Sequence, residues 1–209
     1  AMTHKGYTKQ ELISAGLAVN GKNGRLYDKF RNRLMLPVID VRGDVVGFGS
    51  RVLDKSEPKY MNTPETLTYS KRRILYGMNL AKKSKRSNII LCEGNLDVVT
   101  LHQAGFDNAV ASMGTALTQE QLRLLSRYTK ELVLCYDNDN AGQQATRRAL
   151  ELLNNSEFSV KVLQLPRRLV DGEYIKQDAD DFIKFQGPAA FERLLTGSEN
   201  GVEFRLDQI

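Results

Sequence analysis

The chain has 209 residues, of which 41% are hydrophobic and 26% charged, an ordinary composition for a globular protein with one large or two small domains. No apolar run approaches the roughly 20 residues that cross a bilayer, and no secretory pattern opens the chain, so we expect a cytoplasmic protein without membrane attachment. The two cysteines form no CxxC pair and have no neighbouring histidine, which predicts buried free thiols rather than a zinc site.

The net charge of +5 conceals two halves of opposite sign. Residues 1–88 hold 18 lysines and arginines against 7 acidic residues, whereas residues 89–209 hold 12 against 18. This asymmetry favours a part that binds a polyanion joined to a part that holds cations, although a merely solvated basic face has the same count. Ala1 precedes Met2, an order that predicts an excised piece of a longer protein.

The basic half contains one predicted helix and one predicted hairpin. The helix covers Thr8–Ala15 and stops at Gly16. We predict strands over Leu34–Ile39 and Val45–Leu53. The short glycine-containing turn between them predicts that the two strands form a hairpin. The segment Lys55–Thr68 carries two prolines and predicts a loop.

Basic and aromatic side chains of this half fit a surface for a single nucleic-acid strand. Arg31 and Arg33 alternate with apolar neighbours, so at strand spacing both would point to the same side. Arg51 ends a glycine-rich strand that a phosphate could approach closely. Tyr60 and Tyr69 carry rings that can stack on bases, with plain loop packing as the alternative for Tyr60.

Residues 89–165 alternate between strand-like and helix-like patterns. The predicted strands are Ile89–Cys92, Asn108–Met113, Leu132–Tyr136 and Phe158–Leu165, and the predicted helices are Leu96–Ala104, Thr118–Tyr128 and Ala141–Asn154. The basic stretch Lys82–Arg86 predicts a solvated linker at a subdomain boundary, residues 167–177 predict a polar loop, and Ala179–Phe185 and Pro188–Leu195 predict closing helices. Successive β-then-α units predict an α/β fold with a parallel sheet and helices on both faces.

Acidic residues follow several of these strands. The pattern Glu93-Gly94-x-x-Asp97 follows the first strand, Asp137-x-Asp139 follows the third, and Asp178-x-Asp180 comes after the fourth. Carboxylates gathered at one edge of a sheet repel one another unless a divalent cation neutralises them, which predicts a magnesium site for phosphate chemistry. Each motif alone is weak, since Asp97 also fits an ordinary first-turn acid and Asp180 or Asp181 an N-cap.

Together these motifs resemble the TOPRIM domain. The match consists of Glu93-Gly94-x-x-Asp97, Ala111-Ser112-Met113-Gly114-Thr115 and Asp137-x-Asp139-x-Ala141-Gly142. The basic half narrows the resemblance to bacterial replicative primases, through Tyr27-Asp28-x-Phe30-Arg31-x-Arg33-Leu34-Met35-x-Pro37, Gly47-Phe48-Gly49-x-Arg51, Pro58-Lys59-Tyr60-x-Asn62-x-Pro64-Glu65-Thr66, Lys71 and Leu75-Tyr76-Gly77. Asn95 and Ala179 depart from the usual residues, and Arg167–Gln177 is longer than the family pattern.

The resemblance implies a catalytic-core fragment of a primase, which makes short RNA primers on single-stranded DNA from NTPs with Mg²⁺, or Mn²⁺ as a substitute. It implies a TOPRIM-type Rossmann-like parallel sheet flanked by helices over residues 88–166. Part of a smaller basic α+β subdomain would precede it over 1–87, and an acidic loop with closing helices would complete it over 167–209. A replicative helicase would bind the full-length protein through a domain absent from this chain.

The resemblance also assigns roles to individual side chains. Glu93, Asp137 and Asp139 are the implied catalytic and metal-binding acids, with Asp97, Asp178 and Asp180 as supporting ligands, and Glu93 acting alternatively as a general base. The implied nucleotide- and nucleic-acid-binding residues are Arg31, Arg33, Arg51, Lys59, Asn62 and Lys71. Two alternatives stay open: a DNA-cleaving TOPRIM enzyme, such as a nuclease or topoisomerase, and a nucleic-acid-binding module that is inert in isolation.

Overall fold

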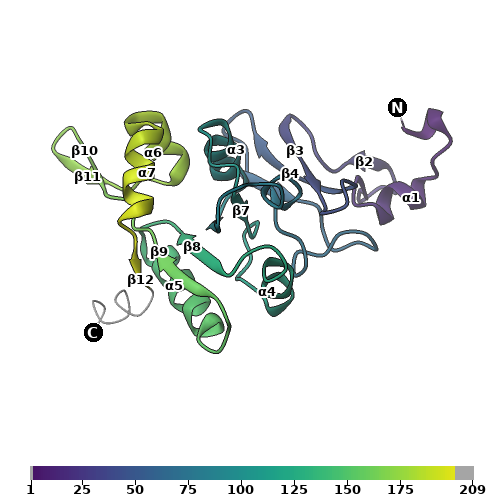
Figure 1. The fold of residues 1–209 in the computed structure, drawn as a ribbon. Coiled ribbons are helices and arrows are strands. Elements are labelled where there is room, and N and C mark those ends of the chain that lie inside the picture. The colour runs from purple at the N-terminus through teal and green to yellow at the C-terminus, as the bar shows by residue number, and fades with distance from the viewer. Residues whose placement is uncertain (1, 201–209) are drawn as a thin grey trace. The chain divides into compact units, whose positions relative to one another are not determined.

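The computed structural model describes residues 2–200, with side chains described up to residue 198, and divides them into two compact units that separate between Lys71 and Arg72 (Figure 1). None of the helices in the described part of the chain has the length and apolar character that crossing a membrane requires. The predicted domain layout, with boundaries after residues 87 and 166, stays a prediction.

The first unit contains a short helix and two antiparallel sheets. Its elements are a 3₁₀ turn at Met2–Lys5, α1 (Lys9–Ser14), the ribbon β1 (Ala18–Asn20) and β2 (Leu26–Asp28), and the sheet β3 (Arg33–Ile39), β4 (Val45–Val52) and β5 (Tyr60–Asn62) in spatial order β3-β4-β5. Thr8 caps α1 in a capping box with Glu11, whose carboxylate accepts a 2.7 Å hydrogen bond from the Thr8 N–H. The predicted helix and the predicted β3–β4 hairpin are confirmed.

The first unit also departs from three expectations. The segment Lys55–Thr68 contains β5, because Tyr60 pairs with Arg51 and the strand joins the edge of the sheet despite the flanking prolines. Strand β3 begins only at Arg33, and the preceding Asn32 has a left-handed φ of 51°, so alternation does not relate Arg31 to Arg33. The third departure is Tyr69, which the sequence predicts to stack on bases.

Tyr69 lies in the core of the first unit. Its exposed fraction is 0%, and its ring fills the space over Gly47, where an added Cβ would lie 3.0 Å from the tyrosine Cδ2. Gly47 therefore serves close packing of a side chain rather than the approach of a phosphate. The prediction that Tyr69 stacks on bases is wrong, whereas Tyr60 is exposed.

The second unit is built on a mainly parallel five-stranded sheet. Its elements are α2 (Met78–Ala81), β6 (Asn88–Cys92), α3 (Asn95–Gln103), β7 (Ala109–Ala111), α4 (Gln119–Leu125), β8 (Glu131–Cys135), α5 (Asn140–Leu153), β9 (Ser159–Val162), β10 (Arg168–Val170), β11 (Glu173–Ile175), α6 (Ala179–Gln186), α7 (Pro188–Thr196) and β12 (Glu199–Asn200). The spatial order is β12-β9-β8-β6-β7, with β6 to β9 parallel and β12 antiparallel at one edge. The predicted α/β fold is confirmed.

Helices cover both faces of this sheet. On one face the side chains of β6 and β8 pack with α3, α6 and α7, whereas α5 lies on the opposite side (Figure 1). The buried members of the first layer include Ile90, Cys92, Val98, Leu101, Val133, Cys135, Phe182, Phe191 and Leu195. Because strand side chains alternate between faces, the continuous apolar runs of β6 and β8 fill both layers at once.

Two polar segments are more ordered than the sequence predicts. Residues 167–177 contain the hairpin β10–β11, in which Asp171 and Gly172 turn the chain with φ values of 49° and 85°. An Asp-Gly pair between alternating apolar residues is a strong hairpin signal, so the expected loop is wrong. Arg86 also differs from a solvated linker residue, because it forms two hydrogen bonds with Glu192 and its guanidinium lies 4.9 Å from the centre of the Phe106 ring.

Candidate metal centre

The candidate metal centre lies at the carboxyl ends of two adjacent strands, from which the chain continues to opposite sides of the sheet. Strands β6 and β8 are neighbours, and Cys92 pairs with Cys135 at their carboxyl ends. The chain leaves β6 through α3 toward β7 on one side and leaves β8 through α5 toward β9 on the other. Connections that diverge from two adjacent strands open a crevice beyond the strand ends, which is where α/β sheets bind ligands.

Glu93 and Asp137 lie just beyond the carboxyl ends of β6 and β8. Glu93 directly follows β6, and Asp137 comes two residues after the end of β8. Glu93 Oε1 accepts a 3.3 Å hydrogen bond from the Asp137 N–H. Burial raises the pKa of Glu93, and the charge of Asp137 raises it further. Burial also raises the pKa of Asp137, and the nearby Asp178 carboxylate adds to the effect. These two acids, predicted from different motifs, therefore meet at one edge together with Asp178.

Asp97 lies in the first turn of α3, with 8% of its surface exposed. Its Oδ2 accepts from the Gly94 N–H at 3.1 Å and its Oδ1 accepts from the Asp180 N–H at 3.2 Å. Burial, and then the charge of Asp178, raises the pKa of Asp97 to about 7. Its contacts thus join the β6–α3 connection to the start of α6, which an ordinary exposed first-turn acid would not do.

Asp139 caps α5 with one carboxylate oxygen and forms an ion pair with Lys176 through the other. Its Oδ1 accepts from the Gly142 N–H at 2.9 Å, and its Oδ2 accepts from Lys176 Nζ at 2.6 Å. The hydrogen bond from Lys176, followed by that from Gly142, lowers the pKa of Asp139. Lys176 also lies 4.0 Å from Asp137 Oδ2. No motif singled out this lysine in the sequence.

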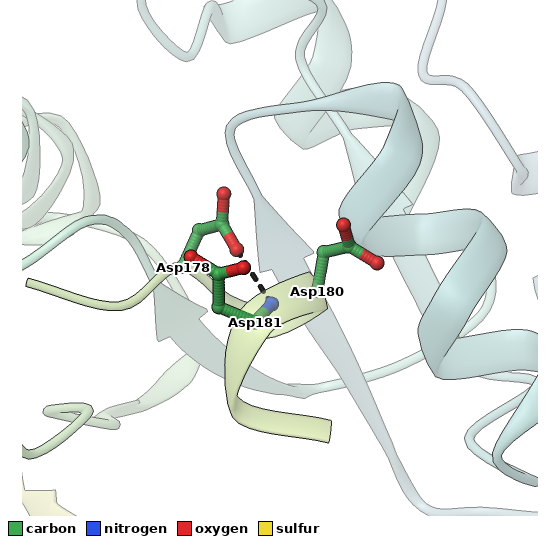
Figure 2. A group of neighbouring side chains, drawn as sticks. All are labelled: Asp178, Asp180 and Asp181. Carbon is green, nitrogen blue, oxygen red and sulfur yellow. Dashed lines mark hydrogen bonds between the residues drawn. The ribbon is translucent and has the colours of Figure 1, made fainter. Parts of the chain in front are cut away.

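The third acidic motif forms a compact group at the start of α6. Within the described residues, Asp178, Asp180 and Asp181 are the one set of three whose candidate ligand oxygens all lie within 4.8 Å of one another. Figure 2 shows Asp178 accepting a hydrogen bond from the Asp181 N–H, at 2.7 Å, so Asp178 is the N-cap rather than Asp180 or Asp181. The Asp180 carboxylate turns toward α3, where its Oδ1 accepts a hydrogen bond from the Thr100 hydroxyl. Its Oδ2 accepts from Lys184 Nζ, one turn further along α6, at 2.5 Å.

The donor set fits a hard divalent cation. Burial raises the pKa values of Glu93, Asp97, Asp137 and Asp178, and for each of these groups the charge of another carboxylate raises the pKa further. A cation among them would remove this repulsion, and carboxylate oxygens are the ligands that such ions prefer. Asn95, two residues after Glu93 in the chain, has a buried Oδ1 without a hydrogen-bond partner among the described residues.

The candidate nucleic-acid residues all belong to the first unit. Arg51 is exposed on β4 and pairs with Tyr60 of β5, and Asn62 lies two residues further along the same strand. Residues that pair across an antiparallel ladder share a face, so these three side chains lie on one side of the sheet. Lys59 is exposed, with its ammonium 5.4 Å from the centre of the Tyr60 ring.

The remaining basic candidates have different surroundings. The Arg31 guanidinium is exposed and lies 6.0 Å from the centre of the Tyr27 ring. Arg33 donates to the Pro58 carbonyl at 2.8 Å, and its Nη1 is buried without a partner among the described residues, so it braces the loop before β5. The backbone N–H of Lys71 donates to Glu65 at 2.8 Å. The binding roles of all six residues stay predictions.

The buried Asp97 predicts a pH dependence of stability. Its folded pKa of about 7 exceeds the ordinary 3.8, so between these values the folded chain holds a proton that the unfolded chain has released. The free energy of unfolding should therefore fall by about 1.4 kcal/mol per pH unit from this group as pH rises from 4 toward 7. Urea unfolding in EDTA should show this slope in the parent and a flatter one in Asp97→Asn; parallel profiles would contradict the buried state of Asp97.

Comparisons with known proteins identify the family of the chain. The family model "DNA primase catalytic core, N-terminal domain" matches residues 1–82, and a "Toprim-like" model matches residues 90–183. A DNA primase of Clostridium acetobutylicum is 46% identical over 208 residues, covering 99% of this chain and 33% of that protein.

Solved structures give the same result. A DnaG primase catalytic domain bound to single-stranded DNA matches with a TM-score of 0.86 and 37% identity, over 99% of this chain and 67% of that one. The RNA polymerase domain of Mycobacterium tuberculosis primase matches with a TM-score of 0.81 and 34% identity, over 97% of this chain and 67% of that one.

A parallel sheet with acids at its strand ends, preceded by a basic unit, is the arrangement of a Toprim-like domain joined to the N-terminal domain of a primase catalytic core. The chain belongs to the DNA primase family, as part of the catalytic core. It spans about a third of the length of the curated relatives that it matches.

Proposed function

We propose that this chain carries out nucleotidyl transfer in a primase, a DNA-templated RNA polymerase that makes short RNA primers on single-stranded DNA. The observation that carries the proposal is that Glu93, Asp137 and Asp178 come together at the carboxyl ends of β6 and β8, in a chain of the primase family. Where connections diverge from two adjacent parallel strands, α/β sheets bind their ligands beyond the strand ends, so a nucleotide and its metal would bind here.

The contacts of each acid suggest either metal binding or a structural role. Glu93 and Asp137 would hold the cation, Mg²⁺ or Mn²⁺ in its place, and Asp139, whose Oδ2 accepts from Lys176, would complete the set. Such an ion supplies Lewis acidity at the phosphate and lowers the pKa of an attacking hydroxyl. Asp97 orients the β6–α3 connection that carries Glu93, Asp178 caps α6, and Asp180 ties α6 to α3 through Thr100.

The first unit would bind the template and the nucleotide. Arg51 and Asn62, on one face of its sheet, and the exposed Lys59 beside them are the strongest candidates, with Arg31, Arg33 and Lys71 around them. A relative solved with single-stranded DNA supports a template of that kind. The RNA primer and NTPs follow from the reaction, a replicative helicase would bind through a part of the protein outside this chain, and a replication role implies the cytoplasm.

Primer synthesis by the full-length protein tests the proposal. We expect short RNA products that require single-stranded template, NTPs and Mg²⁺ or Mn²⁺, and that disappear with EDTA and return with excess Mg²⁺. The products would be resolved on a gel from labelled NTPs. Cleavage of labelled DNA without NTPs would instead identify a DNA-cleaving TOPRIM enzyme, and salt-dependent binding of single strands without any product would identify a binding module.

A further inference from the structure

Lys176 reaches the metal centre from an anchored hairpin. The neighbouring Gln177 is 2% exposed and donates to the Pro166 carbonyl at 2.7 Å, which closes the base of the β10–β11 hairpin. The Arg168 guanidinium lies 3.5 Å from the centre of the Phe185 ring, which ties the hairpin to α6. These two contacts hold the backbone of Lys176 next to Asp139 and Asp137, so the lysine is a fixed part of the centre.

The lysine occupies an oxygen that a cation would need. Asp139 Oδ1 is engaged by the Gly142 N–H, which is fixed in the first turn of α5, and Oδ2 is engaged by Lys176 Nζ at 2.6 Å. The same ammonium lies 4.0 Å from Asp137 Oδ2. The other hydrogen bonds to the Asp139 carboxylate come from the Gly142 and Ala141 backbones in the first turn of α5, so Lys176 is the partner that can leave without disturbing a helix terminus.

The exposure of Lys176 makes its departure easy. Its side chain is 57% exposed, and ion pairs of that exposure are weak, since water solvates both charges and the long side chain loses freedom when it is held. A lysine ammonium is a compact charge on a flexible stem, so it can swing away into solvent. The arrangement therefore suits a counter-ion that is exchanged rather than one that is permanent.

We propose that Lys176 is an internal counter-cation that competes with the divalent ion for Asp139 and Asp137. A metal ion entering the centre has to displace the ammonium, so Lys176 lowers the metal affinity of the resting protein. This inference rests on the proposed function, because it assumes that these two aspartates hold the metal. It makes Lys176 a positioning residue that acts through the carboxylates.

Mn²⁺ binding to the metal-free full-length protein tests this role. Free Mn²⁺ would be titrated by electron paramagnetic resonance, without nucleotide or DNA, in the parent, Lys176→Gln and Lys176→Arg. We expect Mn²⁺ to bind about fivefold more tightly to Lys176→Gln, which corresponds to the loss of a competing exposed ion pair. Lys176→Arg, which keeps the charge, should stay within twofold of the parent. A purely structural salt bridge predicts unchanged or weaker binding in Lys176→Gln, and that result would overturn the proposal.

Lys130→Gln is the matched control. Lys130 Nζ lies 2.6 Å from Glu157, its side chain is 60% exposed, and it precedes β8 at the edge of the sheet opposite the centre. A gain in Lys130→Gln equal to that in Lys176→Gln would reduce the effect to overall charge and overturn the proposal. Asp137→Asn separates the two levels of inference: if it leaves Mn²⁺ binding unchanged, the metal centre itself is misassigned, whereas weaker binding in Asp137→Asn without a gain in Lys176→Gln rejects the role of Lys176 alone.

Discussion

Replacing Asp137 with asparagine in the full-length protein is expected to reduce primer synthesis by about a thousandfold while the fold and the binding of single-stranded DNA survive. The substitution keeps the shape of the side chain but removes a charged metal ligand, and metal ions contribute several kcal/mol of transition-state stabilisation in phosphoryl chemistry. The measurement is incorporation of labelled NTPs on a single-stranded template, with DNA binding followed in parallel by fluorescence anisotropy.

Stability and binding should respond differently from activity in this variant. Burial and the charge of Asp178 raise the pKa of Asp137, so a neutral asparagine relieves strain in the metal-free protein and should not lower its free energy of unfolding. Glu157→Gln, which removes an exposed carboxylate charge at the Lys130 ion pair, is the control and should keep full activity. Activity of Asp137→Asn within a few-fold of the parent would reject the metal centre.

Gly142→Ala is expected to damage both stability and activity without altering any charge. Gly142 lies buried in the first turn of α5, and an added Cβ would fall 2.0 Å from the Asp137 carbonyl oxygen. Because real Cβ contacts with backbone do not come that close, the segment from Asp137 to Asp139 has to move away from the helix. We expect a loss of about 2–3 kcal/mol in the free energy of unfolding, in line with overpacking elsewhere.

The same shift should lower primer synthesis by about a hundredfold, since misplacement of ligands by about an ångström has effects of that size. Chemical denaturation and primer assays on the same preparation measure the two losses. Gly197→Ala is the matched control, because its Cβ would meet the Arg193 carbonyl at an ordinary 3.5 Å and its φ of −90° suits alanine. Equal stability of Gly142→Ala and the parent would show that the Asp137 segment is not packed against α5 as described.

The meeting of Glu93 and Asp137 could be predicted from the sequence. Both follow continuous apolar runs, which identify strands buried on both faces, and parallel strands place their carboxyl ends at one edge. The motif that begins at Asp178 could be assigned to the same end of the sheet. The sequence does not show which of its aspartates caps α6, because their spacing is compatible with more than one N-cap. That choice depends on where the chain returns to the sheet.

Other features depend on contacts between distant segments. Arg33 looks like a surface cation in sequence, but it braces the Pro58 loop, and Tyr69 looks like a base-stacking ring, but it packs on Gly47. Neither burial follows from local pattern, since both partners lie more than twenty residues away. Lys176 reaches Asp139 across 37 residues only because the β10–β11 hairpin closes at Gln177.

Two buried thiols at the carboxyl ends of β6 and β8 provide a chemical probe for opening of this part of the sheet. Cys92 and Cys135 pair across β6 and β8, and 0% and 4% of their surfaces are exposed. The pKa of the Cys92 thiol is raised, first by its contact with Cys135 and then by burial, so a thiol reagent can react only when these strand ends separate. The modification rate thus reads out transient opening of this part of the sheet, with no need for an introduced probe.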